Sequence, residues 1–550
     1  MKKKCKMKNI VAIIFALLTV SCKAQKLNSS KEVNVPKLVI GIVVDQMRYD
    51  YLTRFEAKYS EQGFKRLMNE GYNCKNHHFN YVPTYTGPGH ASVYTGTSPM
   101  NHGIISNYWY DKYTDATVYC ASDSTVQAVG VNTEKEKMSP RRLKTTTVAD
   151  QLRLHTQNRS KVIGVSLKDR GAILPAGHSA NAAYWFRGKE DCKFITSTYY
   201  RNDLPSWVKK FNKTTTSYLR EWQTILPIKS YTESGSDSNN FEEAFKGKTT
   251  AVFPYNLTAL AEDNGGYDIL KATPFGNEMV TDFAIEAIKN ENLGTDTHTD
   301  FLTVSYSSTD YIGHQFGVNS IEVEDTYIRL DKDLERLFKY LDNQVGKGAY
   351  TVFLTADHGA VNVPNYLKSQ KIPAGYFKKK EFKKAVEDVL IQKFKLKGLV
   401  KNISNNQLFL DRELINKSGL DLIAVQEFLA QEIVLFKHID KAYSAKTLSS
   451  AQFVSGVGAL VQNGFHQKHS GDVVFVLEPA VISYSEKGST HGSSFSYDTH
   501  VPLLFYGAGI KKGETIEKTE VIDIAPTISA LLGISFPNGC TGKPLEKILE

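Results

Sequence analysis

The stretch LVIGIVVD at residues 38–45 decides the fold class, because seven apolar residues in a row end at a carboxylate. A continuous apolar run of this length is typical of a strand buried on both faces of a parallel sheet. Similar runs follow at 162–166, 301–306, 350–355 and 501–506. Helical patterns lie between them, above all at 321–341, where apolar residues recur with a period near 3.6. Strands that alternate with helices predict an α/β fold with a doubly wound, mostly parallel sheet.

Charged residues follow these predicted strands. Asp45 ends the first run, Lys168 comes shortly after 162–166, Asp310 follows 301–306, and Asp357 and His358 follow 350–355. In doubly wound sheets, ligands bind beyond the carboxyl ends of the strands. The sequence therefore predicts a functional site at this edge of the sheet.

Two stretches break the alternation. Residues 185–265 are polar and predict a loop-rich insertion, and residues 366–484 predict a small α+β lobe inserted into the core. In the lobe we expect helices near 380–396 and 420–434 and strands near 407–411 and 472–478. The predicted division is a signal peptide at 1–22, a core at 36–184, 266–365 and 485–550, and the two insertions between. A chain of 550 residues is too long for one compact core.

The N-terminus predicts export. Five lysines precede the apolar run Ile10–Val20, which is shorter than the roughly 20 residues that span a membrane. A short apolar segment behind a basic end is typical of a secretory signal. Residues 19–22 resemble a loose lipobox, which would leave Cys22 lipidated and anchor the protein to a membrane; residues 22–24 instead resemble an ordinary cleavage site. The predicted location is the periplasm, or the outer membrane or cell surface as a lipoprotein.

The net charge and the cysteines further restrict the class of protein. The net charge is +9, but five of the basic residues lie in the predicted signal, so the rest is close to neutral. This argues against a nucleic-acid-binding protein, whose positive charge would be large and concentrated. Four cysteines follow the signal, without the spacing of a zinc knuckle, and allow either three disulfide pairings or buried free thiols: Cys74, Cys120, Cys192 and Cys540.

Several residues form a candidate metal site. Asp310 and His314 are four residues apart and share one face if the segment is helical. Alone, each such pair is weak support, and a single histidine in a loop is ordinarily solvated. Together, three carboxylates and three imidazoles offer oxygen and nitrogen ligands without a thiolate: Asp45, Asp310, His314, Asp357, His358 and His491. That mixture suits zinc, with manganese or iron as lesser options.

Thr86 is the candidate nucleophile. It opens the stretch Thr86–His90, in which Pro88 is placed near the first turn of a predicted helix. A helix N-terminus favours anions, and a bound cation can hold a hydroxyl deprotonated. The alternative is that Thr86 is only a helix cap. The competing hydroxyls are those of Thr84, Ser92 and Thr95.

The order of these residues resembles the alkaline phosphatase superfamily. The ligands follow its two-metal order, the stretch 86–90 is similar to the T-x-P-x-H nucleophile segment of its phosphodiesterase branch, and 519–533 is similar to its closing helix. Within it, the segments 103–111 and 165–170 resemble PafA-type bacterial alkaline phosphatases, which have a threonine nucleophile.

The resemblance implies two Zn²⁺ ions per chain and a phosphothreonine intermediate. It implies that one zinc is held by Asp45, Thr86, Asp357 and His358. It implies that the other is held by Asp310, His314 and His491. It also implies that phosphoryl oxygens are contacted by Asn107, Lys168 and Arg170. We expect a monomer that acts on small phosphate monoesters.

Lys168 and Arg170 favour monoesters on physical grounds. A phosphate monoester is a dianion with three non-bridging oxygens, whereas a diester carries one charge and a second bulky group, so two fixed cations suit the monoester. The nearest alternative is a phosphodiesterase or nucleotide pyrophosphatase on the same fold. A sulfatase would need a Cys or Ser nucleophile in a modification motif, which is absent around Thr86. An alternative of another class is a non-catalytic surface binding protein.

Overall fold

The computed structural model describes residues 35–550. The predicted signal peptide at 1–22, with Cys22, lies outside the described residues. Within the described part of the chain, no helix has both the length and the apolar character needed to cross a bilayer. The four cysteines of this part are all free thiols.

A ten-stranded sheet forms the centre of the core. β1 (Leu38–Val44) lies between β13 (Tyr350–Thr355) and β12 (Asp300–Tyr306), and β7 (Val162–Ser166) and β8 (Ala182–Arg187) continue the parallel order beyond β12. Every residue of β1 is buried, as its unbroken apolar run predicts. The predicted doubly wound, mostly parallel sheet is confirmed.

Two strands that flank this parallel centre run the other way. β20 (Leu503–Gly507) is antiparallel to β13, although the run 501–506 looks like the parallel strands in sequence. Its start therefore lies at the edge where the parallel strands end, which brings the preceding segment, with His491, to the same edge. On the opposite side of the sheet, β9 (Lys193–Ser197) pairs with β8, so the sheet continues into the predicted insertion 185–265.

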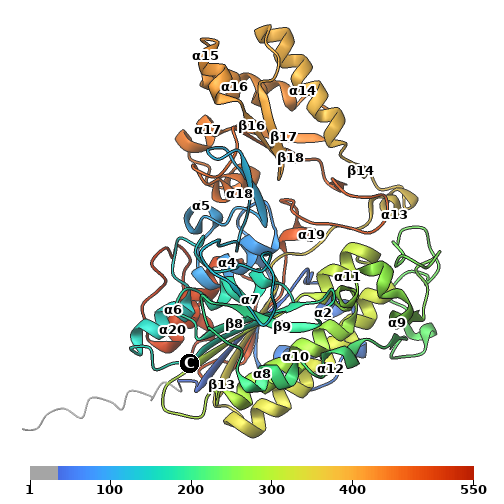
Figure 1. Cartoon of the computed structure of the whole chain (residues 1–550), viewed down its shortest axis with the longest axis vertical. Coiled ribbons are helices and arrows are strands. Elements are labelled where there is room, and N and C mark those ends of the chain that lie inside the picture. Colours follow the sequence, from blue (N-terminus) through green and yellow to red (C-terminus); the bar gives the residue numbers. More distant parts are fainter. Residues whose placement is uncertain (1–34) are drawn as a thin grey trace, which may run out of the picture. The chain divides into compact units, whose positions relative to one another are not determined.

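Helices cover both faces of the sheet (Figure 1). α4 (Thr86–Thr95) and α7 (Asp169–Ala176) pack together on one face, with α6 (Val148–His155) and α20 (Ile524–Leu532) beside them. The other face carries α10 (Pro274–Asn290) and α12 (Ile321–Leu341). α12 has the bounds that its periodicity predicts, and the Ser320 side chain caps it by accepting the N–H of Val323.

The segment 366–484 contains a four-stranded antiparallel sheet and its own hydrophobic cluster. Its strands are β15 (Val400–Ser404), β16 (Gln407–Leu410), β17 (Ile439–Ser444) and β18 (Val473–Leu477). α14 (Lys379–Phe394) and α16 (Leu422–Ile433) pack with them, as the orange ribbons in Figure 1 show. The lobe touches the core where Asn405 donates to the carbonyl of Tyr108, at 2.7 Å.

The insertion has little regular structure. It contains α8 (Ser206–Phe211), β10 (Glu221–Trp222), β11 (Tyr255–Asn256) and α9 (Leu257–Leu260), joined by short turns and loops. Buried aromatic side chains, among them Trp222 and Tyr255, pack it against the core. The predicted domain limits stay a prediction.

Candidate active site

The candidate ligands lie where the strands end, as the sequence predicts. Asp45 follows β1 directly, and Asp357 and His358 follow β13. α11 (Ser308–Phe316) begins just after β12 and presents Asp310 and His314 one turn apart. Side chains from segments far apart in the chain therefore meet at one edge of the sheet.

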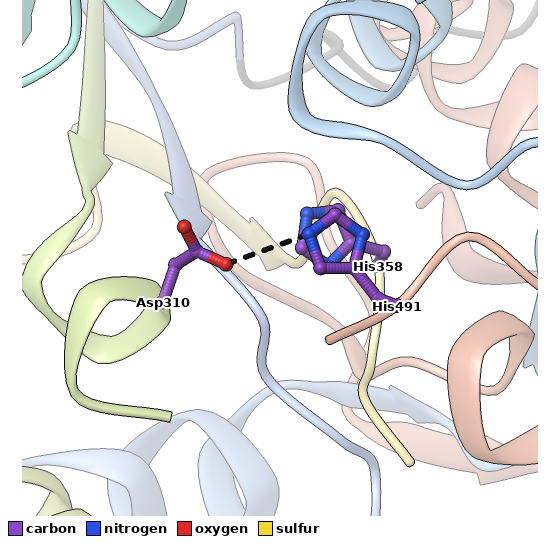
Figure 2. A group of neighbouring side chains, drawn as sticks. All are labelled: Asp310, His358 and His491. Carbon is purple, nitrogen blue, oxygen red and sulfur yellow. Dashed lines mark ion pairs between the residues drawn. The ribbon is translucent and has the colours of Figure 1, made fainter. Parts of the chain in front are cut away.

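All six candidate ligands come together there. His358 Nε2 lies 3.4 Å from Asp45 Oδ1, and His314 Nε2 lies 3.1 Å from Asp310 Oδ1. His491 Nε2 lies 3.7 Å from the same oxygen of Asp310, an ion pair drawn as a dashed line in Figure 2. The rings of His358 and His491 stack with their centroids 3.4 Å apart, as Figure 2 shows.

Backbone carbonyls orient the three imidazoles. Nδ1 of His314 lies 2.7 Å from the carbonyl of Ser489, and Nδ1 of His491 lies 2.7 Å from that of Thr84. Nδ1 of His358 lies 3.0 Å from the carbonyl of Gly359. Because a carbonyl only accepts, each Nδ1 carries the proton and donates it, which leaves Nε2 as a free lone pair facing the carboxylates. Metal-binding histidines show this arrangement.

The donor set fits a divalent cation. Among the described residues, Asp45 Oδ1, Asp357 Oδ2 and His358 Nε2 are buried without a hydrogen-bond partner. Two trios bring their donor atoms close enough to share an ion: one is Asp45, Asp357 and His358, and the other is Asp310, His358 and His491. Oxygen and nitrogen donors without sulfur match zinc chemistry. His358 belongs to both trios and His314 to neither, so the predicted division of ligands between two ions stays a prediction.

The buried carboxylates at this position also favour the binding of cations. Burial, together with Asp310 and Asp357, raises the pKa of Asp45 well above its ordinary value. Lys168 Nζ lies 2.6 Å from Asp45 Oδ2 and 2.5 Å from Asp310 Oδ2. Burial also lowers the pKa of both His358 and His491, which favours the neutral imidazole that binds metals.

Thr86 is the first residue of α4 and is buried. The helix start touches the ligand segment through His90, whose Nδ1 lies 2.9 Å from the Thr86 carbonyl and 3.2 Å from Asp357 Oδ2. Gly89 makes this approach possible, because a Cβ atom there would lie 2.5 Å from the Asp357 carbonyl oxygen. Sequence reasoning missed this role of His90, although its place one turn after Thr86 points to it.

Asn107 lies beside the same helix start. Its Oδ1 accepts the N–H of Gly87 at 2.7 Å, so its Nδ2 is left to donate elsewhere. Its carbonyl accepts the N–H of Cys120 at 2.9 Å. Asn107 is thereby fixed at the base of the hairpin formed by β4 (Tyr108–Asp111) and β5 (Ala116–Tyr119).

A residue of the same hairpin, Tyr119, forms a hydrogen bond with Arg170. Arg170 Nη1 donates to the hydroxyl of Tyr119 at 3.3 Å, and that hydroxyl donates in turn to Asp169. Tyr119 pairs with Tyr108, the residue after Asn107. Sequence reasoning missed Tyr119, because nothing in its neighbourhood along the chain points to an arginine about fifty residues away.

A doubly wound sheet with a buried carboxylate–histidine cluster, beside a helix that begins with a threonine, defines a hydrolase of the alkaline phosphatase superfamily. The family model described as type I phosphodiesterase / nucleotide pyrophosphatase matches residues 39–501, and the chain belongs to this family.

Similar proteins support this placement. The chain is 46% identical to alkaline phosphatase PafA of Elizabethkingia meningoseptica, over 96% of each chain. The crystal structure of wild-type PafA matches with a TM-score of 0.90 over 94% of this chain and 99% of that one. A Myroides odoratus protein named calcium-transporting ATPase is 47% identical over 95% of this chain and 96% of its own. The predicted resemblance to PafA-type phosphatases is confirmed.

Proposed function

We propose that this protein is an exported, metal-dependent alkaline phosphatase that hydrolyses phosphate monoesters through a phosphothreonine intermediate. The observation that carries the proposal is the cluster of six ligand side chains, with each free Nε2 turned towards carboxylates, beside the Thr86 end of α4. The names of the relatives agree with it: PafA and the Synechococcus elongatus protein PhoV, 42% identical, are both named alkaline phosphatases.

The ligands would hold two Zn²⁺ ions. Asp45, Thr86, Asp357 and His358 would hold one, and Asp310, His314 and His491 would hold the other. When bound, such cations supply Lewis acidity, which lowers the pKa of a hydroxyl and offsets the negative charge of reacting oxygens.

Thr86 Oγ1, having lost its proton, attacks phosphorus in line with the ester oxygen. The ester P–O bond breaks, the departing alkoxide takes a proton from water, and the phosphoryl group stays on Thr86. Water then attacks the same phosphorus, the bond to Thr86 breaks, and inorganic phosphate leaves. Asn107 Nδ2 and Arg170 would donate to the non-bridging oxygens, and Lys168 would add a buried ammonium.

The preference for monoesters rests on those cations. Lys168 is 4% exposed, so solvent screens its charge little. A diester offers one negative charge to two cations, whereas a monoester offers two. A phosphodiesterase remains the alternative, and it predicts faster turnover of diesters with little loss on Lys168→Ala.

Export and location are part of the proposal. The lysine-rich start and short apolar segment 10–20 support a signal peptide that delivers the protein to the periplasm or, through a lipidated Cys22, to a membrane surface. We propose that the mature enzyme works as a monomer.

The test compares purified wild-type protein and Thr86→Ala on a monoester, a diester, a sulfate ester and ATP, the last because of the name of the Myroides relative. We expect the monoester to be the best substrate, activity to disappear on chelation and to return with zinc, and Thr86→Ala to lose at least about 10³-fold in kcat while still binding zinc. Near-normal turnover by zinc-loaded Thr86→Ala would overturn the assignment of the nucleophile.

A further inference from the structure

A cavity of about 160 Å³ adjoins the two cations of the candidate site. Lys168, Arg170 and Tyr311 line it, and so do three cationic residues to which the reaction assigns no role: Arg187, Lys189 and Lys271. Lys168 Nζ lies 4.9 Å from the centre of the Tyr311 ring, so Tyr311 stands where the candidate site and the cavity meet.

The cavity is formed by tightly packed backbone. Lys189 lies in the turn between β8 and β9, and its carbonyl accepts the N–H of Tyr267 at 2.9 Å. A Cβ atom on Gly188 of the same turn would lie 2.4 Å from Asp268 Oδ1. Lys271 follows three residues after Asp268 on the facing segment. The backbones of the two segments are therefore held together at the cavity wall, and each segment contributes a lysine to its lining.

Cationic residues outnumber carboxylates in the lining of this cavity. Its lining has five cationic residues but only three carboxylates, those of Glu136, Asp169 and Asp268. Glu136 pairs with Arg187 at 3.3 Å, and Asp268 pairs with Lys271 at 2.7 Å. Asp169 accepts from the Tyr119 hydroxyl instead. Carboxylates outside the lining pair with two of these cations: Asp191 with Arg187, and Asp45 and Asp310 with Lys168. The cations left for a further anion are therefore Arg170 and Lys189.

Two of the cationic side chains can still bind a further anion. Arg170 Nε is buried without a hydrogen-bond partner among the described residues. Across residues 35–550, Lys189 makes no ion pair. Burial lowers the pKa of Lys271, but Tyr311 and Asp268 raise it above its ordinary value, so this ammonium stays charged in alkaline solution. The cavity wall thus offers charge and donors that suit an oxyanion.

We propose that this cavity binds a second anionic group of the substrate, so that the enzyme favours phosphate monoesters that carry another phosphate. The inference rests on the proposed function, because it places the reacting phosphoryl group at Lys168 and Arg170. The second phosphate then lies in the cavity, where Lys271 and Lys189 attract it. A cavity of this volume admits a phosphate group.

A matched pair of substrates tests this. The monophosphate and the bisphosphate of 1,3-propanediol have the same chain and differ in one phosphate group. We expect the wild-type protein to show a kcat/KM at least about ten-fold higher for the bisphosphate, beyond the factor of two that its second reactive group supplies. High salt should reduce this preference, because it screens the attraction between exposed charges.

Two variants test whether the preference for the bisphosphate depends on this cavity. Lys271→Ala and Lys189→Asn should each lower kcat/KM for the bisphosphate about five- to ten-fold and leave the monophosphate unchanged within two-fold. Asparagine suits position 189, because the backbone there has a φ of 45°. Lys229→Ala, at an exposed lysine elsewhere, is the matched control and should change neither substrate.

The outcomes are distinct. Equal losses on both substrates in both variants, or no preference for the bisphosphate in the wild-type protein, would overturn the second-anion site. Failure of the wild-type protein to hydrolyse either compound would overturn the proposed function instead. The exposed position of Lys189 keeps the test decisive if Lys271→Ala proves unstable.

Discussion

Tyr119 shows how one side chain couples parts of the candidate site. Its hydroxyl accepts from Arg170 and donates to Asp169, while its strand partner Tyr108 follows Asn107. Tyr119 touches neither the candidate ligands nor the reacting atoms, so it is a positioning residue. Its contribution is to restrict the guanidinium to the orientation in which it can meet a phosphoryl oxygen.

Tyr119→Phe should therefore lower kcat/KM for a phosphate monoester about ten-fold, because one hydrogen bond to a charged group is lost. The effect on a diester should be smaller, since a diester depends less on Arg170. In a double-mutant cycle, adding Tyr119→Phe to Arg170→Ala should change little. Tyr113→Phe, at an exposed tyrosine in the turn of the same hairpin, is the control. Additive losses in the cycle would show that Tyr119 acts independently of Arg170.

At the scale of elements, the position of α4 depends on its glycines. The first turn of α4 lies against the backbone of Asp357, with Gly89 at the contact. The same contact sets the place of Thr86, three residues earlier, because α4 moves as a rigid unit. A helix start that brings its residues close to a ligand segment must omit side chains where the backbones meet.

Gly89→Ala should consequently destabilise the protein and impair the site together. The added methyl group would lie 2.5 Å from the Asp357 carbonyl oxygen, so the helix or the ligand segment must move. We expect a cost of about 1–3 kcal/mol, seen as a lower Tm, and a loss of kcat of more than about ten-fold. Gly235→Ala is the control, because its nearest atom would lie at an ordinary 3.5 Å. An active Gly89→Ala protein with an unchanged Tm would contradict this account of the helix.

At the scale of the whole molecule, the sequence predicts the parallel centre of the sheet well. Apolar runs such as 38–44 and the period of 321–341 are local signals, and both match β1 and α12. The direction of β20 is not local: its run looks like the others, and only pairing with β13 makes it antiparallel. The candidate ligands were predictable because most of them follow closely after predicted strands. Tyr119 was not, because its partner Arg170 is distant in sequence.

A buried pair of glutamates links the insertion to the core. Glu322 lies in the first turn of α12 and is 0% exposed, and Glu242 of the insertion is 5% exposed. Each uses one oxygen, Glu322 with the Tyr255 hydroxyl and Glu242 with Asn239 Nδ2 at 2.6 Å. Among the described residues, the other oxygen of each carboxyl group has no hydrogen-bond partner.

The charged groups around this pair would not balance its negative charge. Asp237 adds negative charge, and Lys248 Nζ, which lies 2.8 Å from the carbonyl of Pro254, is the nearby cation. Burial raises the pKa of Glu322 to about 8, and burial together with Glu322 raises the pKa of Glu242 further. The folded protein therefore keeps protons here that the unfolded chain releases near pH 4–5.

Because the folded state binds more protons than the unfolded state, the stabilising contribution of this pair is complete only below about pH 4–5, and it falls as the pH rises from there through about 8 and above. Glu242→Gln removes one of the two acids. Between pH 7 and pH 10, the zinc-loaded variant should lose about 1–2 kcal/mol less stability than the wild-type protein, measured by Tm across that range. Glu190→Gln, at an exposed glutamate, should follow the wild-type protein. Parallel pH profiles for wild type and Glu242→Gln would show that the pair is ionised throughout, with its charges balanced by other groups.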